Sequence, residues 1–228
     1  MRIIFVRHGH PNYDDDCLTE LGHKQAEAVA QRLKNEKIDR VFSSSCGRAA
    51  ETAEHIAKLH NKEVILCDFM QEIGWGHVDG EPIEDNGHPW TVSAKMFSRG
   101  ENIMNENWAN EEPFLKNKYK VNALRLAGDL DKWLAELGYE REGRYYRTKT
   151  CNTETVVMAC HGGSSAAALS HLLNIPVPFM CSSVAFGYTG IHILKLSERE
   201  GVLTAPRIEL INDVRHIAGL EIENVFGI

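Results

Sequence analysis

The sequence predicts an α/β fold with a mostly parallel central sheet flanked by helices. Short runs such as Ile3–Val6 and Thr155–Ala159 are apolar or β-branched and carry no charge, which suits strands buried on both faces. Segments with apolar residues at helical spacing alternate with these runs. Because parallel strands need crossover connections, this alternation favours a parallel sheet covered by helices.

The individual elements follow from the same patterns. The expected strands are 3–6, 40–43, 63–67, 155–159, 183–188, 191–196 and 207–211. The expected helices are 19–35 with Thr19 as N-cap, a segment after Gly47, 119–137 ended by Gly138, and 164–173 with Ser164 as N-cap. No repeat or flexible linker divides the chain, so we expect a single domain over residues 1–228.

The composition indicates a folded protein, with 228 residues of which 43% are hydrophobic. The net charge of −7 disfavours non-specific binding to nucleic acid or to an anionic membrane, because both need an excess of Lys and Arg. No apolar run approaches the roughly 20 residues that span a bilayer, and no secretion signal is evident, so we expect a cytoplasmic location. The six cysteines form no CxxC pair, which argues against a zinc ribbon.

Polar residues of defined chemistry lie just after the expected strands or in the first turn of a helix. They are Arg7, His8, Arg48, Glu72 and His161. Because open α/β sheets bind ligands at the carboxyl ends of their strands, we expect these side chains at one edge of the sheet. A neutral imidazole can attack phosphorus, guanidinium groups bind phosphate oxygens, and a carboxylic acid can protonate a departing alkoxide. The set therefore suits phosphoryl transfer on a small phosphorylated substrate.

Two other interpretations of this edge remain open. In one, His8, His10 and His161 bind a metal ion together with Asp14 or Asp16, although nearby arginines would repel a cation. The acidic run that contains both aspartates is otherwise a solvated loop. In the other interpretation, the pocket binds a phosphorylated ligand without turnover.

Two further segments carry alternatives. Residues 81–122 are irregular and contain Pro82, Pro89 and Pro113, so we expect a partly helical insertion over the active edge. Its aromatic residues either form a lid or specificity element or pack in a small core of their own. Residues 141–149, which carry three arginines and a lysine, are expected to be a solvated loop or hairpin, or a contact for an acidic substrate tail.

The chain also carries short motifs in a fixed order. They are Arg7-His8-Gly9; Leu18-Thr19-Glu20-Leu21-Gly22 with Gln25-Ala26; Ser43-Ser44 with Arg48-Ala49 and Thr52-Ala53; Glu72-Ile73-Gly74-Trp75-Gly76 with Asp79-Gly80; His161-Gly162-Gly163; and Asn212-Asp213 with His216. This series resembles the histidine phosphatase superfamily, the phosphoglycerate mutase-like clan. The resemblance runs from residue 2 to residue 216, leaves mainly the insertion unmatched, and implies a three-layer sandwich.

The resemblance also implies roles for the candidate residues. His8 is expected to become phosphorylated, while Arg7, Arg48 and His161 hold the phosphate. Glu72 is expected to protonate the leaving group and then to activate water. Because protein side chains supply both nucleophile and acid, no metal or organic cofactor is implied.

The residues after the first motif depart from the family pattern. His10 replaces the usual Thr or Glu, so it either contacts phosphate or substrate or faces solvent, and Asn12 is a second candidate for substrate binding. Phosphoglycerate mutases usually carry an Arg directly after the acid, whereas Ile73 follows Glu72 here. The sequence therefore favours hydrolysis of a phosphate monoester through a phosphohistidine. Mutase-type phosphotransfer is the alternative, since a lid would shield the phosphohistidine from water. The sequence does not indicate an oligomeric state.

Overall fold

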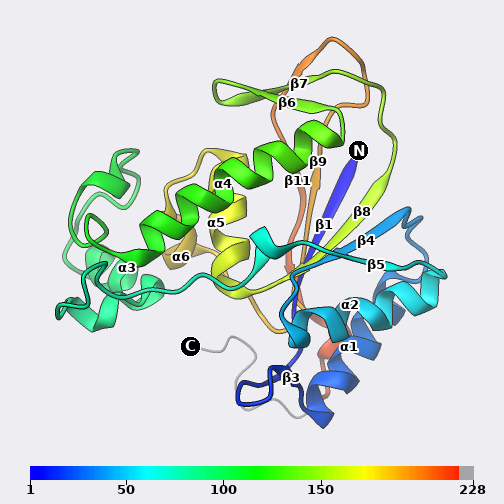
Figure 1. The fold of residues 1–228 in the computed structure, drawn as a ribbon, viewed down its shortest axis with the longest axis horizontal. Helices are drawn as coiled ribbons and strands as arrows, with labels where there is room; N and C mark the ends of the chain where they lie inside the picture. The colour runs from blue at the N-terminus through cyan, green and yellow to red at the C-terminus, as the bar shows by residue number, and fades with distance from the viewer. Residues whose placement is uncertain (221–228) are drawn as a thin grey trace.

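The computed structural model describes residues 1–220 and contains a six-stranded sheet in the order β11-β9-β1-β8-β4-β5 (Figure 1). Its strands are β1 (Arg2–Arg7), β4 (Arg40–Ser43), β5 (Val64–Leu66), β8 (Thr155–Cys160), β9 (Ile191–Lys195) and β11 (Arg207–Asp213). β1, β8, β4 and β5 are mutually parallel, and β9 is antiparallel to both β1 and β11. The mostly parallel sheet predicted from the sequence is confirmed.

Helices cover both faces of this sheet and complete three layers (Figure 1). They are α1 (Glu20–Leu33) and α2 (Gly47–His60) on one face, and α4 (Lys118–Glu136), α5 (Gly162–Leu173) and α6 (Val177–Ser183) on the other, with α3 (Pro89–Ser98) packed against α6. The side chains of β1 alternate between the two cores: Ile3 and Phe5 join the core on the α4–α5 side, and Ile4 and Val6 join the core under α1 and α2. This alternation explains why residues 3–6 of the strand form an uninterrupted apolar run.

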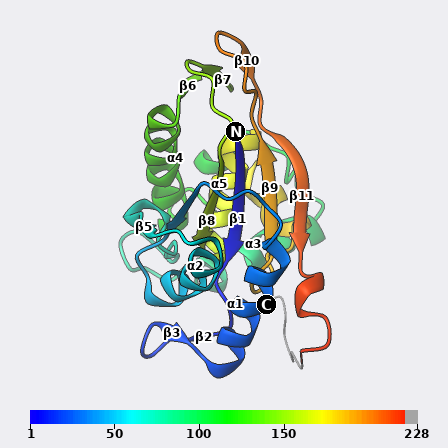
Figure 2. The same ribbon diagram turned by 90° about the vertical axis from the view of Figure 1, so that its right-hand side faces the viewer.

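Two small sheets lie at opposite ends of the molecule (Figure 2). β6 (Tyr139–Glu142), β7 (Tyr145–Thr148) and β10 (Leu203–Thr204) form one sheet near the start of β1. β2 (Pro11–Asn12) and β3 (Cys17–Leu18) form the other, beyond the carboxyl end of β1. The hairpin interpretation of residues 141–149 is therefore confirmed.

Two predictions about local structure are wrong. Residues 183–188 are not a strand, because α6 begins after Pro176 and continues to Ser183, and the chain then runs irregularly to β9. The N-cap of α5 is His161 rather than Ser164. β8 continues to Cys160, so the helix starts at once, and the Ser164 hydroxyl accepts a hydrogen bond from the His161 backbone N–H at 3.2 Å.

The segment predicted as an insertion lies beside α6 and the start of α5 (Figure 1). It contains α3 and two short 3₁₀ turns, Glu84–Gly87 and Trp108–Asn110. α4 begins at Lys118, within the last residues assigned to the insertion. Within residues 1–220, no helix combines the length and apolar character needed to cross a membrane.

Candidate functional site

The loop after β1 is held close to the start of α1 by two glycines. A Cβ atom on Gly9 would lie 2.6 Å from the Gly22 carbonyl oxygen, and one on Gly22 would lie 2.2 Å from the His10 carbonyl oxygen. The Thr52 hydroxyl accepts a hydrogen bond from the Gly9 N–H at 3.1 Å. The loop that carries His8 is therefore fixed from both α1 and α2, which explains the glycine in each of the first two motifs.

His8 is buried and its tautomer is set by the backbone. Its Nδ1 lies 2.7 Å from the Gly9 carbonyl oxygen, which can only accept, so Nδ1 carries the proton and Nε2 presents its lone pair. The Arg48 Nε approaches this Nε2 at 3.4 Å. Burial, reinforced by the charges of His161 and Arg7, lowers the pKa of His8 well below its usual value. The ring is therefore neutral at pH 7.

Arg48 is oriented by Asp16. The two side chains form a short ion pair, and the other carboxylate oxygen of Asp16 accepts a hydrogen bond from the Gly47 N–H at 2.8 Å. Asp16 thus satisfies a donor at the start of α2 and fixes the guanidinium at the same time. This pairing differs from the two roles considered from the sequence, a metal ligand and part of a solvated run.

Arg7 is buried beside the irregular segment that precedes β9. Its Nη1 donates to the Phe186 carbonyl at 2.5 Å, and its Cζ lies 4.2 Å from the centre of the Tyr188 ring. The Asn212 side chain accepts a hydrogen bond from the Gly187 N–H at 2.8 Å. Asn212, in the last motif of the sequence, therefore fixes the segment before β9 that contacts Arg7.

His161 completes the cluster. Its ring centre lies 5.1 Å from that of His8, and its Nε2 shares a hydrogen bond of 2.8 Å with the Ser44 hydroxyl. Its Nδ1 is buried and has no hydrogen-bond partner in the part of the chain that the structure describes. Burial, followed by the charges of Arg48 and Arg7, lowers the pKa of His161 well below its usual value.

Glu72 lies at the N-terminus of α5. Its carboxylate accepts hydrogen bonds from the backbone N–H groups of Ile73 at 2.9 Å, Ser164 at 3.0 Å and Gly163 at 3.3 Å. Burial raises the pKa of Glu72, although these N–H groups and the charge of Arg7 act in the opposite direction. Glu72 therefore holds a proton at a higher pH than an exposed glutamate does.

His10 and Asn12 bond to their own neighbourhood. The His10 Nδ1 lies 2.9 Å from the Thr19 hydroxyl. The Asn12 side chain accepts from the Asp14 N–H at 3.1 Å and donates to Asp15 at 2.8 Å. These contacts order the loop before α1, and a contact of either side chain with substrate remains a prediction.

A cavity of about 310 Å³ opens beside Arg7 and Glu72, and we call it the vestibule. Its other large side chains are aromatic: Tyr13, Trp75, His88, Trp90 and Phe186. The backbone of Gly162 and Gly163 and the residues 181–185 complete the lining. The vestibule therefore adjoins the candidate acid and one of the candidate phosphate-binding arginines.

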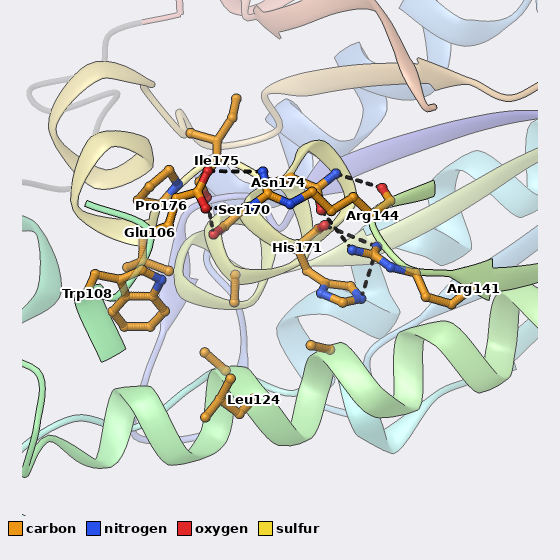
Figure 3. A pocket seen from close by; sticks show the side chains of 14 residues that line it. Glu106, Trp108, Leu124, Arg141, Arg144, Ser170, His171, Asn174, Ile175 and Pro176 are labelled. Carbon is orange, nitrogen blue, oxygen red and sulfur yellow. Dashed lines mark hydrogen bonds and ion pairs between the residues drawn. The ribbon is translucent and has the colours of Figure 1, made fainter. Parts of the chain in front are cut away.

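A second cavity, of about 290 Å³, lies near the C-terminus of α5 (Figure 3). Figure 3 shows Trp108 and Leu124 toward one end and Arg141 and His171 toward the other. Arg141 donates to the Asn174 side chain at 2.8 Å and to the His171 carbonyl at 3.3 Å. These contacts at His171 and Asn174 lie nine and twelve residues, or about 14 to 18 Å along α5, from Gly162 at the candidate site. Arg141 is therefore too distant to contact a substrate at His8.

Residues 1–220 contain no group of three or more His, Cys, Asp or Glu side chains arranged to hold a metal ion. The predicted candidates Arg7, His8, Arg48 and His161 meet in one buried cluster, with Glu72 at its edge.

Sequence reasoning missed three supports of this cluster, namely Asp16, Ser44 and Tyr188. A signal existed for Asp16, since an arginine in the first turn of a helix calls for a nearby anion. Ser44 stands within a motif, but the motif alone did not indicate its partner. No local pattern indicated Tyr188, because its contact with Arg7 joins distant parts of the chain.

Comparison with protein families now defines the class. The model of the histidine phosphatase superfamily (branch 1) matches residues 3–113. This match covers just under half of the chain and includes the first four motifs, so residues 3–113 belong to the histidine phosphatase superfamily.

Particular relatives are known from sequence and from structure. The chain is 36% identical over 93 residues to the probable phosphoglycerate mutase GpmB of Photorhabdus laumondii, covering 37% of this chain and 43% of that protein. The match thus spans less than half of that relative's length. Among solved structures, a phosphoserine phosphatase mutant from Entamoeba histolytica bound to phosphoserine aligns with a TM-score of 0.59, 24% identity and coverage of 95% and 98% of the two chains. A mycobacterial glucosyl-3-phosphoglycerate phosphatase aligns with a TM-score of 0.61, 22% identity and coverage of 92% and 98%. At these identities the structural matches establish the fold.

Proposed function

We propose that this chain is a phosphate-monoester hydrolase that acts on a small phosphorylated metabolite through a phosphohistidine on His8. The observation that carries the proposal is the hydrogen bond between His8 Nδ1 and the Gly9 carbonyl. It leaves Nε2 unprotonated and facing the guanidinium of Arg48. A nucleophile directed at a cationic group is suited to attack an anionic phosphate, which the guanidinium would bind and neutralise.

The reaction proceeds in two steps. In the first, the lone pair of His8 Nε2 forms a bond to phosphorus, the ester P–O bond breaks, and the proton of Glu72 passes to the departing oxygen. In the second, the Glu72 carboxylate takes a proton from water as the water oxygen attacks phosphorus. The N–P bond then breaks, its electron pair returns to Nε2, and inorganic phosphate leaves. Arg7, Arg48 and His161 hold the phosphate oxygens in both steps.

The environment of Glu72 supports its part in both steps. Burial raises its pKa and keeps it protonated more readily for the first step. The three backbone N–H groups at the start of α5 stabilise the carboxylate that remains. The same group can therefore act first as an acid and then as a base.

Phosphoglycerate mutase activity is the second candidate, favoured by the name of the GpmB relatives. A mutase returns the phosphoryl group from histidine to the product, so water must be excluded from the site. The position after Glu72, where an arginine was expected for a mutase, holds the buried Ile73. Hydrolysis is therefore the function that the site supports better.

The test compares the wild type with His8→Ala and with the control His23→Ala, which removes an exposed histidine on α1. Each protein is incubated with benzyl phosphate and with 3-phosphoglycerate in EDTA, and inorganic phosphate and 2-phosphoglycerate are measured. We expect phosphate release by the wild type and the control, and none by His8→Ala. An acid-labile phosphate should be trapped on the wild type and not on His8→Ala.

Several results would contradict the proposal. Formation of 2-phosphoglycerate in excess of phosphate would assign mutase activity. Absence of both phosphate release and trapped phosphohistidine with every ester would indicate a binding protein. Unchanged hydrolysis by His8→Ala would exclude His8 as the nucleophile.

A further inference from the structure

The vestibule carries an inference about the substrate, which rests on the proposed function. Glu72 must donate its proton to the leaving oxygen, so the leaving group has to lie beside Glu72. The vestibule is the cavity that Glu72 and Arg7 both line. Its side chains therefore decide which leaving groups bind.

An aromatic wall forms one side of the vestibule. The rings of Trp75 and His88 lie 4.9 Å apart between centres, those of His88 and Trp90 5.7 Å, and those of Trp90 and Phe186 6.4 Å. We call these four residues the aromatic wall. Such a continuous series of ring faces and edges offers apolar contact to a ring or chain.

The wall begins directly at the phosphate-binding cluster. A methyl group placed on Gly162 would lie 3.6 Å from the Trp90 ring and 3.7 Å from the guanidinium carbon of Arg7. One small residue thus separates Trp90 from the group that would hold the phosphate. The first atoms of a leaving group would contact the wall as soon as they extend beyond the phosphate.

The vestibule also offers no cation to a second anionic group. Among the residues described, Arg7 is the one Lys or Arg side chain in its lining, and the proposed function commits Arg7 to the phosphate. His88 is held neutral, because burial lowers its pKa below the usual value. Residues 221–228 contain no Lys, Arg or His. A carboxylate bound here would lose its hydration without gaining a charged partner.

We propose that the substrate is a phosphate ester whose leaving group is uncharged and apolar, such as a small ring on an alkyl alcohol. Phosphoglycerate and phosphoserine, which carry a carboxylate, are disfavoured. A volume of about 310 Å³ lies at the lower end of the range for ligand sites, about 300 to 1,000 Å³, which suits one or two rings.

The test uses benzyl phosphate and 4-carboxybenzyl phosphate, which present the same ring and the same type of alcohol and differ in one carboxylate. We expect kcat/KM for benzyl phosphate to be at least about tenfold higher. The non-hydrolysable benzylphosphonate should likewise bind more tightly than its 4-carboxy analogue in calorimetry. Equal or better binding and turnover of the carboxylated compounds would overturn the proposal.

Two variants locate the preference in the vestibule. Trp90→Ala should lower kcat/KM for benzyl phosphate by about tenfold, with a much smaller fall for methyl phosphate. Ser183→Arg places a cation at an exposed position of the lining and should shift selectivity toward 4-carboxybenzyl phosphate. Phe97→Ala, which removes an exposed aromatic ring on the same helix as Trp90, is the matched control and should leave the benzyl-to-methyl ratio unchanged. An unchanged ratio in Trp90→Ala would refute the role of the wall.

The phosphonates separate this proposal from the proposed function. Preferential binding of benzylphosphonate without turnover of any ester would leave the ligand class standing and reject the hydrolase. Turnover of both benzyl esters at equal rates, with equal phosphonate binding, would retain the hydrolase and reject the ligand class.

Discussion

Replacing Asp16 with Asn isolates the contribution of the ion pair to Arg48. Asp16 has a positive φ of 50°, which Asn tolerates better than most residues, and the amide oxygen can still accept from the Gly47 N–H. What is lost is the acceptor that faces Arg48, because the amide nitrogen, which only donates, then points at the guanidinium. A hydrogen bond between charged groups contributes about 1.5–3 kcal/mol, so the loss is about that size.

If the whole of this loss in binding free energy applies to the transition state, kcat/KM for benzyl phosphate should fall roughly ten- to a hundredfold. The melting temperature should change by no more than about 4 °C, since the cap is retained. Steady-state kinetics and thermal unfolding measure the two quantities separately. Asp14→Asn is the control, because the Asp14 side chain is exposed and makes no ion pair among the described residues. Unchanged kcat/KM in Asp16→Asn, alongside a large loss in Arg48→Ala, would refute the idea that Asp16 orients Arg48.

Three further predictions concern the same site. His8 is in its nucleophilic form above its lowered pKa, and Glu72 is in its acid form below its raised pKa. We therefore expect kcat/KM for an alkyl phosphate to fall as pH rises through the pKa of Glu72. A pH profile in which Glu72→Gln keeps that alkaline fall would contradict the assignment. Gly9→Ala should destabilise the protein by about 1–3 kcal/mol in urea unfolding, because the new Cβ meets the Gly22 carbonyl oxygen; equal stability would show that the loop can shift. Ser44→Ala removes the hydroxyl on His161 Nε2 and should lower kcat/KM about tenfold without unfolding the protein, whereas wild-type kinetics would show that packing alone positions His161.

The elements predicted correctly are those whose apolar or capping side chains directly indicate where they lie in the fold. Residues 3–6 of β1 and 156–160 of β8 are apolar because both faces of these strands are covered, and Thr19 caps α1 as its position suggested. The strand predicted at 183–188 failed because an apolar segment near the core looks the same whether it is extended or irregular. Its conformation depends on Arg7, which takes the Phe186 carbonyl as a partner.

The candidate residues were predictable because they stand at strand ends and helix starts, positions that the sheet gathers at one edge. The residues that orient these candidates through hydrogen bonds were not predicted. Asp16 meets Arg48 across 32 positions of sequence, and Ser44 meets His161 across 117. The position of Arg48 in the first turn of α2 indicated a nearby anion, but no local pattern identifies which distant residue the folded backbone brings within hydrogen-bond distance.

The sequence by itself determined the α/β class, the order of the main elements and the residues that gather at the active edge, because periodicity and strand-end position are local properties. The tertiary structure decided the tautomer of His8, the counterion of Arg48 and the apolar, cation-poor vestibule beside Glu72. These features arise from burial and from contacts between distant segments. Both depend on how the layers pack and not on the order of residues along the chain.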